Sequence, residues 1–330
     1  MPQPSLTAVH SPTPLTNIAV AYIQDNDAYI ADKVFPVVPV QHQSDLYYIW
    51  NKADFFRNNA RKRADATESA GSGFNLTTDS YSADVWALHD DIGEQARANQ
   101  DPSIDLETTT TEWLMQQLLI SRDLNFATTY MTTGVWGTDV TGVAVTPGGG
   151  QVWQWSDDGN SDPYTDIATA QTTILQNTGK KPNVLVLSWA VYQALRKNPL
   201  VVDRIKYTMQ ADAKAITPQL LAASFDIEEV VVAEATYNTA KEGQAASMSF
   251  IVGKTAMLCY RPQAPGLRIP SAGYIFAWNG LDGMGVFGAR SWSEPLPNRG
   301  RNTIRVEAEM AYALKKVGAD LGYFWNTIVA

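Results

Sequence analysis

The sequence is poor in the residues that many enzymes and secreted proteins depend on. It contains one cysteine, Cys259, and only three histidines. A single cysteine cannot form an intrachain disulfide, and we expect it to be a small buried residue. A lone cysteine with remote histidines is also a weak basis for nucleophilic catalysis.

Positive charge and long apolar runs are scarce as well. Lys and Arg number 25 against 34 Asp and Glu, which leaves a net charge of -9. Tight sequence-independent binding to nucleic acid needs a dense set of Lys and Arg, so a nucleic-acid-coating protein is excluded. Residues 1–20 contain no Lys or Arg and therefore lack the charged start of a secretory signal. No apolar run approaches the roughly 18 residues of a membrane span, and we expect a soluble protein made in a reducing cytoplasm.

The motifs of common enzymes are missing. We find no G-x-S-x-G nucleophile elbow and no phosphate-binding P-loop. The glycines of 280–285 (GLDGMG) have the wrong order for a dinucleotide fingerprint, and we interpret them as a turn. The best metal or acid–base candidate is His89-Asp90-Asp91, but neighbouring residues of a strand point to opposite faces, and metal sites need three or four converging ligands. The sequence predicts no enzyme, no cofactor and no metal site.

The chain begins with prolines at positions 2, 4, 12 and 14, which argue against a helix or a central strand. Apolar residues follow, more than a free disordered tail would carry. They are Ile18, Val20, Tyr22, Ile23, Tyr29, Ile30, Val34 and Phe35. We interpret residues 1–44 as an extended arm that lies either on its own body or on a neighbour.

Residues 45–90 predict one long hairpin. Its first strand is 46–50 (LYYIW), rich in strand formers, and 81–88 (YSADVWAL) is the expected return strand. The long polar loop between them is of a kind that tends to be functional or mobile. It holds the only dense basic cluster, made of Arg57, Arg61, Lys62 and Arg63.

Three interpretations of this cluster stay open. It could touch phosphate, it could be a solvated loop tip, or it could pair with acidic residues of another subunit. The acidic total charge favours the protein partner over DNA. The candidate acidic residues are Glu107, Glu112, Asp157 and Asp158.

The clearest helix is predicted at 101–131. Asp101 can cap it and Pro102 suits its first position. Its apolar stripe consists of Trp113, Ile120, Leu124, Ala127 and Met131, flanked by Leu114 and Leu118. At 1.5 Å per residue it would span about 45 Å, which is long for a globular domain.

The remaining chain predicts an α/β part followed by a return to strands. Residues 134–162 are rich in glycine and predict irregular structure with short strands around Trp136, Trp153 and Trp155. Helices are then expected at 164–178, at 189–197 after a cap at Ser188, and from Thr217-Pro218 to 221, and strands at 184–187, 227–232 and within 249–260. Residues 304–312 alternate apolar and charged side chains, which indicates a half-buried strand, and a last strand is expected at 323–329.

This order of arm, hairpin, long helix, inserted α/β part and returning strands resembles the Hong Kong 97-like fold of tailed-phage major capsid proteins. Several stretches are similar to that family. They are 31–40 (ADKVFPVVPV) followed by Tyr47-Tyr48, Trp155-Ser156 and 161–163, 181–188 (KPNVLVLS), 235–243 (ATYNTAKEG) and 322–326 (GYFWN).

The resemblance implies an α+β fold with named parts. Residues 1–44 would be the N-arm and 45–90 the extended E-loop hairpin. Residues 91–149 would belong to the peripheral (P) domain with its spine helix at about 101–131, and 150–275 would be the inserted α/β axial (A) domain. Residues 276–330 would return to the P-domain strands.

The resemblance also implies a function. The chain would be a structural protein that self-assembles, through hexamers and pentamers, into the icosahedral shell enclosing phage double-stranded DNA. Further partners would be a portal protein, decoration proteins as additional candidates, and packaged DNA in weak, non-specific proximity, with no membrane. The proline-rich start without heptads predicts a separate scaffolding protein. The protein would be assembled in the host cytoplasm and found in the virion capsid.

The residues expected to contact neighbouring subunits come from the arm and the hairpin. They are Ile18, Tyr22, Ile23 and Tyr29 in the N-arm, and Arg57, Arg61, Lys62 and Arg63 in the E-loop.

Three alternatives remain at this stage. An encapsulin-type nanocompartment shell would share the fold and assemble without a scaffold. A tail-tube protein would form rings or stacks. A carbohydrate-binding module or hydrolase would use Trp136, Trp153 and Trp155 in a concave site, but the sequence shows no converging carboxylate pair for it.

Overall fold

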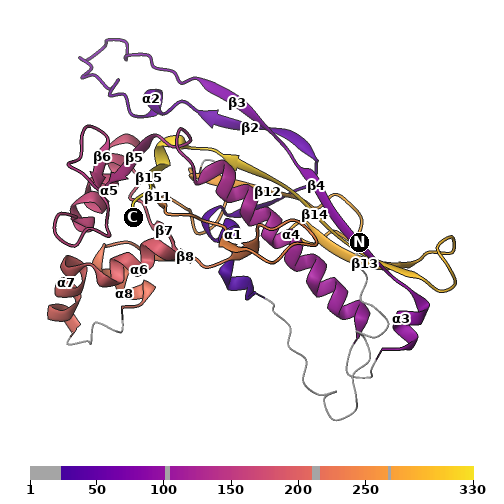
Figure 1. Cartoon of the computed structure of the whole chain (residues 1–330). Helices are drawn as coiled ribbons and strands as arrows, with labels where there is room; N and C mark the ends of the chain where they lie inside the picture. The colour runs from indigo at the N-terminus through magenta and orange to yellow at the C-terminus, as the bar shows by residue number, and fades with distance from the viewer. Residues whose placement is uncertain (1–23, 101–104, 210–215, 267–268) are drawn as a thin grey trace.

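The computed structural model describes residues 24–100, 105–209, 216–266 and 269–330. In these residues the strands form two large sheets and two separate two-stranded hairpins, and the helices lie beside them (Figure 1). The long helix α4 (Leu106–Tyr130) lies along the five-stranded sheet, while α5 (Pro163–Thr178) and the helices that follow it gather around the six-stranded sheet at the other end. The predicted α+β class is confirmed.

The five-stranded sheet is organised around β14 (Ile304–Lys316). Its order is β1 (Val37–Val40), β12 (Gly273–Trp278), β14, β13 (Ala289–Pro295), with β4 (Asp84–Ile92) also paired to β14. Val306, Ala308 and Met310 of β14 are buried in the same core as Leu114 and Phe126 of α4. The intervening charged residues stay partly exposed, so the predicted half-buried strand is confirmed.

The central strands of the six-stranded sheet are buried on both faces. Its order is β6 (Gln151–Trp153), β5 (Thr138–Val143), β15 (Gly322–Asn326), β11 (Ala256–Cys259), β7 (Val184–Ser188), β8 (Glu229–Ala233). Its helices besides α5 are α6 (Trp189–Lys197), α7 (Pro199–Met209) and α8 (Pro218–Ser224). Every residue of β7 and β11 is buried, as expected for the continuous apolar runs of a sheet covered on both sides.

The remaining elements are short. They are the 3-10 turns η2 (Asn26–Ala28) and η4 (Ala319–Leu321), the helices α1 (Ala31–Val34), α2 (Lys52–Phe55) and α3 (Glu94–Ala98), and the hairpin strands β2 (Ser44–Trp50) with β3 (Leu76–Ser82) and β9 (Thr236–Asn238) with β10 (Met248–Phe250).

Local signals predicted most helix ends in the α/β part. The Asp162 carboxylate accepts a hydrogen bond from the Thr165 amide (3.1 Å) at the start of α5, and Gly179 ends that helix in the left-handed conformation. The helix α7, which the sequence did not predict, begins at Pro199, because proline is favourable in the first turn of a helix. The Asn198 side chain supports this start by accepting a hydrogen bond from the Leu200 amide (3.1 Å).

Two predicted boundaries are wrong. The return strand of the hairpin is β3, whereas most of the predicted 81–88 belongs to β4 of the five-stranded sheet. Strand-forming residues continue across this switch of sheets, so composition does not reveal it. The long helix is capped by Asp105, whose carboxylate accepts from the Glu107 amide (3.2 Å), and the predicted cap at Asp101-Pro102 lies outside the described residues.

Two predicted placements are also corrected. Trp113 is exposed, and the buried line of α4 runs through Leu114, Leu118 and Phe126 instead. β15 was expected among the returning P-domain strands, but it lies between β5 and β11 in the six-stranded sheet. Its residues are almost all buried, and only a sheet covered on both faces can bury both sides of a strand.

Phe35 joins the start of the described chain to both the long helix and the five-stranded sheet. Its ring packs edge-on against Phe126 (5.1 Å between ring centroids) and Tyr130 (5.0 Å). A side-chain carbon placed on Gly273 of β12 would lie 2.4 Å from this ring, so glycine is required there. The segment around Phe35 therefore belongs to the subunit's own core.

Candidate interaction surfaces

The β2–β3 hairpin stands apart from both large sheets. Its strands pair from Ser44 opposite Ser82 to Trp50 opposite Leu76, and residues 51–75 extend beyond them. The hairpin projects along one side of the molecule, with its tip above the six-stranded sheet in Figure 1. A two-stranded ribbon is at best marginally stable by itself in water, so its position depends on what it contacts.

The base of this hairpin is fixed to the five-stranded sheet. The rings of Tyr81 and Phe276 stack with centroids 4.5 Å apart, and Tyr47 lies 5.6 Å from the same phenylalanine. The Tyr47 hydroxyl donates a hydrogen bond to the Asp79 carboxylate (2.7 Å). Burial raises the pKa of Tyr47, and the bond from Tyr47 lowers the pKa of Asp79. The hairpin is thus anchored at its base.

Short polar contacts shape residues 51–75, which we call the hairpin tip. Asn51 caps α2 by accepting from the Ala53 amide (3.0 Å), and Asp54 accepts from the Asn75 amide (3.0 Å). Asn59 donates to Ser72 (2.8 Å) across the loop. These contacts all lie within the tip itself.

The tip touches its own subunit at few points. Lys52 forms an ion pair with Asp320, and both side chains are about half exposed. The Phe56 ring lies 3.2 Å from where a side-chain carbon on Gly179 would be, yet most of this phenylalanine stays exposed. An exposed ion pair contributes at most about 1 kcal/mol. These contacts leave most of the tip surface uncovered.

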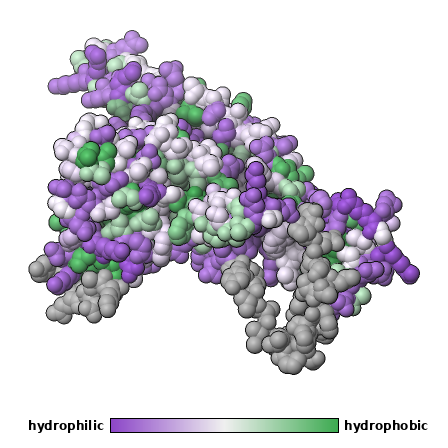
Figure 2. Space-filling view, viewed as in Figure 1, coloured by the Kyte–Doolittle hydropathy of each residue, from purple (hydrophilic) through white to green (hydrophobic). Residues whose placement is uncertain are grey.

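Large apolar side chains are exposed along the hairpin. In the tip, Phe55, Phe56 and Phe74 are each more than half exposed, and the rings of Phe55 and Phe74 lie 5.6 Å apart. Leu46 and Tyr48 are exposed on β2. Figure 2 shows the projecting hairpin as predominantly hydrophilic, so these apolar residues lie among polar and charged ones. Grouped apolar residues with a polar surround are typical of protein–protein contact sites.

The predicted basic cluster lies in the same tip. Arg57, Arg61, Lys62 and Arg63 are all exposed, and Arg57 lies 3.8 Å from Asp54 of its own helical turn. The tip carries five Lys and Arg against three Asp and Glu, although the whole chain is acidic. Contact of the cluster with another subunit remains a prediction. The sequence alone did not single out Phe55, Phe56 and Phe74 as contact residues. They lie in a polar loop, and their spacing follows neither a helical nor a strand period.

The structure describes one of the four predicted contact residues of the N-arm. Ile18, Tyr22 and Ile23 lie outside the described residues. The Tyr29 side chain is only 1% exposed and packs in the core around α4. A side chain buried in its own subunit has no surface for a neighbour, so Tyr29 leaves the set of contact residues.

Charged residues of α4 hold this part of the arm in place. The Asp123 carboxylate accepts hydrogen bonds from the backbone amides of Ile30 (2.8 Å) and Ala31 (3.0 Å), and burial raises the pKa of Asp123 to about 6. Arg122 forms an ion pair with Asp32 (3.1 Å). The arm next to α1 therefore lies on its own body.

Two of the catalytic and metal candidates, Asp91 and Cys259, have structural surroundings. Asp91 forms ion pairs with Arg299 (2.7 Å) and Arg305 (2.8 Å), and the Arg305 bond lowers the pKa of Asp91. Burial raises the pKa of the Cys259 thiol to about 12, so it is no nucleophile at neutral pH. Within the described ranges no three His, Cys, Asp or Glu side chains come together to hold a metal ion. Among the same residues no helix is both long and apolar enough to cross a bilayer.

The tryptophans proposed for a sugar site do not form one. Trp136 is buried and donates its indole N–H to the Tyr130 carbonyl (2.7 Å). Trp155 is fully buried in the other core and donates to the Asp166 carboxylate (2.8 Å). Only Trp153 is partly exposed. A concave aromatic platform is therefore contradicted.

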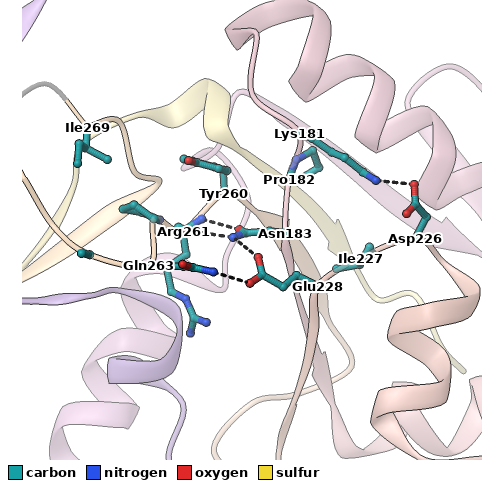
Figure 3. A pocket seen from close by; sticks show the side chains of 12 residues that line it. Lys181, Pro182, Asn183, Asp226, Ile227, Glu228, Tyr260, Arg261, Gln263 and Ile269 are labelled. Atoms are coloured by element: carbon teal, nitrogen blue, oxygen red, sulfur yellow. Dashed lines mark hydrogen bonds and ion pairs between the residues drawn. The ribbon is translucent and has the colours of Figure 1, made fainter.

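A shallow depression of about 760 Å³ lies at one end of β7 and β8 (Figure 3). Its charged side chains are paired with each other or with nearby residues. Glu228 accepts from Asn183 and Gln263 (3.1 Å each), which lowers the pKa of Glu228, and Lys181 pairs with Asp226. This network joins the two strands to the segment after β11 and indicates a structural role.

We predict that the free energy of unfolding depends on pH through the Asp166 carboxyl group. Burial raises the pKa of Asp166 to about 6, with a smaller contribution from the charge of Asp162. Between pH 4 and 6 the folded state therefore binds more protons than the unfolded state, and the free energy of unfolding falls as pH rises through this window. We expect this contribution to be about 1–3 kcal/mol after solvent screening.

The Asp166→Asn variant should lose this contribution while its amide oxygen still accepts the Trp155 bond. Urea unfolding at pH 4 and pH 7 should show the variant gaining stability relative to wild type at the higher pH. The exposed control Asp158→Asn should show no such gain. If Asp166→Asn and wild type differ in stability by the same amount at both pH values, Asp166 is not the source of the pH dependence.

Comparisons with known proteins agree on one family and one fold. The family model described as phage major capsid protein E matches residues 138–305, just over half of the chain. The major capsid protein of Pseudomonas phage JBD67 is 27% identical over 327 residues, covering 96% of both chains. The crystal structure of a phage-related protein from Bordetella bronchiseptica RB50 has a TM-score of 0.67 at 23% identity, covering 92% of this chain and 94% of that one. The capsid structure of cyanophage P-SCSP1u has a TM-score of 0.60 at 11% identity, with 93% and 90% covered.

Proposed function

The chain belongs to the phage major capsid protein E family, and from this premise we propose that its projecting hairpin binds a neighbouring copy within the shell. As a major capsid protein with the Hong Kong 97-like fold, it forms the capsid shell of a phage. The finer proposal is an icosahedral shell, built from hexamers and pentamers, that encloses double-stranded DNA.

One observation carries the hairpin proposal. The tip combines exposed phenylalanines with the cluster Arg57, Arg61, Lys62 and Arg63, and Lys52 and Phe56 contact its own subunit while most of its surface stays exposed. Apolar anchors within a polar rim are the usual composition of a protein–protein interface. In a shell, each copy is held by several such contacts at once, so modest interfaces add up through avidity.

The parts of the subunit are proposed as follows. The N-arm is 1–44, the E-loop hairpin 45–90, and α4 is the spine helix of a P domain that includes the five-stranded sheet. The A domain is centred on 150–275. Because β5 and β15 lie in the six-stranded sheet, we assign these two strands to the A domain as well.

Partners beyond other copies also belong to this proposal. They are a separate scaffolding protein, a portal protein and, in addition, decoration proteins, with packaged DNA in weak and non-specific proximity. The acidic net charge of -9 supports weak contact with DNA. We place assembly in the host cytoplasm and propose that the protein acts structurally, without catalysis. An encapsulin-type shell would share this fold, and it differs by assembling without a scaffold.

Recombinant assembly tests the proposal. The full chain is expressed with and without a candidate scaffolding protein, sedimented, and imaged by electron microscopy. We expect closed particles when the scaffold is present. Closed particles formed equally well without it would support the encapsulin alternative, and a monomer under both conditions would refute shell formation by this chain.

A charge-reversal variant tests the basic cluster in the same assay. Replacing Arg57, Arg61, Lys62 and Arg63 by glutamate should reduce the particle yield at least tenfold at low salt, because charges at an interface reverse from attraction to repulsion. The matched control replaces the exposed Lys197, Lys206, Lys241 and Lys254 by glutamate, which changes the net charge equally outside the hairpin. Equal loss in both variants would show a general charge effect and contradict the specific role of the cluster.

A further inference from the structure

The β9–β10 hairpin turns one face to the core and the other to solvent. Tyr237 of β9 packs against the core around α4, and Ile251, directly after β10, is buried in that core. Successive residues of a strand alternate between the two faces of a sheet. Thr236, Met248 and Phe250 therefore lie on the opposite, outer face of the hairpin, where Phe250 stands across from Thr236.

This outer face carries two large apolar side chains on one strand. Met248 is 62% exposed and Phe250 is 43% exposed. They are two positions apart on β10, so their side chains point the same way and lie roughly 7 Å apart. In the part of the chain that the structure describes, no third strand joins the hairpin. A two-stranded hairpin depends on such packing for its stability, so a cover over this face is expected. We call Met248 and Phe250 the outer patch.

The side chain of Gln24 joins the start of the described chain to the free edge of this hairpin. Its amide group donates to the Thr236 carbonyl (2.6 Å), and its oxygen accepts from the Thr236 amide (2.9 Å). The Ile251 amide donates to the Ala235 carbonyl (3.0 Å), so Ala235 faces β10 and the backbone groups of Thr236 point to the free edge of β9. A carboxamide has the donor and the acceptor of a peptide group, so Gln24 binds this edge as a residue of a further strand would.

The position of Gln24 brings the preceding residues within reach of the outer patch. Thr236 and Phe250 form a pair without mutual backbone hydrogen bonds, and the Cα atoms of such a pair are about 4.5 Å apart. An extended chain advances about 3.3 Å per residue, so two residues before Gln24 suffice to cross this distance. The segment 18–23 can therefore reach the patch of its own copy without any movement of the described chain.

The segment 18–23 (IAVAYI) also matches the outer patch in chemistry. Ile18, Val20 and Tyr22 alternate with small alanines. In an extended chain these three large side chains would lie on one side, at the same spacing of roughly 7 Å as the residues of the patch. Neither the segment nor the outer face of the hairpin carries a charged side chain. Burying one against the other therefore leaves no charge without a partner.

We infer that residues 18–23 dock on the outer patch of their own copy and cover Met248 and Phe250. The occupant is the chain itself, because Gln24 is bound to the same hairpin. A segment tethered next to a site has a high effective concentration there, which a segment from a second copy in solution does not match.

This docking changes the role of the arm. The sequence predicts contacts with neighbouring subunits for Ile18, Tyr22 and Ile23, whereas docking keeps them on their own subunit, as the structure shows for Tyr29. The hairpin tip then remains the projecting element that reaches a neighbour. The inference does not depend on shell formation, because it concerns contacts within one copy, and it is tested on the unassembled protein.

Oxidation of Met248 in the unassembled full chain tests whether the patch is covered. Hydrogen peroxide converts accessible methionine to its sulfoxide, and peptide mass spectrometry gives the rate at each methionine. Replacing Ile18, Val20 and Tyr22 together by asparagine should raise the rate at Met248 about tenfold, because the patch loses its cover. The partly exposed Met284, outside the hairpin, should keep its rate. Equal rates at Met248 in the variant and the wild type would overturn the inference.

Cross-linking identifies the copy that is bound. The native Cys259 is fully buried, so introduced cysteines react with little background. The double variant Tyr22→Cys, Met248→Cys, treated with a short bismaleimide at low protein concentration, should form a link within the monomer. The control pair Tyr22→Cys, Val145→Cys uses an exposed valine outside the hairpin and should give about tenfold less linked monomer.

The outcomes are distinct. Linked dimers in place of linked monomers would show that the arm docks on a second copy and would overturn the assignment to its own copy. Equal linking in the double variant and the control pair would overturn docking at this patch. If the asparagine variant has a lower Tm than the wild type, the cross-link decides, because it leaves the apolar residues 18 and 20 in place.

Discussion

Replacing Phe55, Phe56 and Phe74 together by serine is expected to abolish shell assembly while the isolated subunit keeps its Tm. All three side chains are more than half exposed in the subunit, so their loss removes little from its own core. At an interface, each buried aromatic anchor contributes on the order of 2 kcal/mol or more. Losing three of them should weaken one contact by roughly three orders of magnitude or more, since about 1.4 kcal/mol is a factor of ten.

The measurement is the yield of particles by sedimentation at fixed subunit concentration, with Tm recorded on the unassembled protein. The matched control replaces Val145, Leu175 and Leu200 by serine, which are exposed apolar residues outside the hairpin. Normal particle yield from the phenylalanine variant would show that the tip does not carry the contact. A fall in Tm of the phenylalanine variant would mean that assembly is lost through misfolding, and the basic-cluster variant then decides the question.

Replacing Phe35 by alanine is expected to cost about 3–5 kcal/mol of folding free energy. The ring is fully buried and contacts Phe126, Tyr130 and Trp136, with Gly273 beneath it. Its removal leaves a cavity where the arm, the long helix and the five-stranded sheet meet. Protein of this size has a net stability of the same order of magnitude, so the variant should be largely unfolded or molten at 37 °C.

Urea unfolding followed by tryptophan fluorescence checks this expectation. Phe35→Leu serves as the control, because it keeps most of the volume and should cost clearly less than the alanine variant. The exposed Phe287 offers a second control, since its truncation should have a small effect. A Phe35→Ala protein with wild-type stability would mean that the arm does not form part of the folded core.

The sequence predicts well those elements whose signals are local. α5 follows from the helical spacing of its apolar residues and from Gly179 at its end, and β14 follows from the alternation of apolar and charged residues around Met310. These features depend on backbone conformation and burial within a few residues. They are visible in a single stretch of chain.

What the sequence could not predict is decided by contacts between distant segments. The switch from β3 to β4 near Ala83 has no turn residue to mark it, because the chain stays extended and only its pairing partner changes. The place of β15 depends on coverage of both its faces by helices far away in the sequence. Trp113 follows the helical period closely enough to be counted as core, yet its direction on α4 leaves it exposed.

Some properties of the contact surfaces can be predicted from the sequence, and others require the structure. The charge of the cluster at Arg57–Arg63 can be read directly, whereas the exposure of Phe55, Phe56 and Phe74 requires the structure, because apolar residues are normally expected in a core. Likewise, Tyr29 has the apolar character of an arm anchor, but only the structure shows that it is buried in its own subunit.

A cryo-EM reconstruction of assembled particles tests the central claim most directly. The account predicts that the hairpin tip lies on a neighbouring copy, with Phe55, Phe56 and Phe74 buried there and Arg57, Arg61, Lys62 and Arg63 within ion-pair distance of its acidic residues. A closed shell in which residues 51–75 stay exposed to solvent, or lie only on their own subunit, would contradict it.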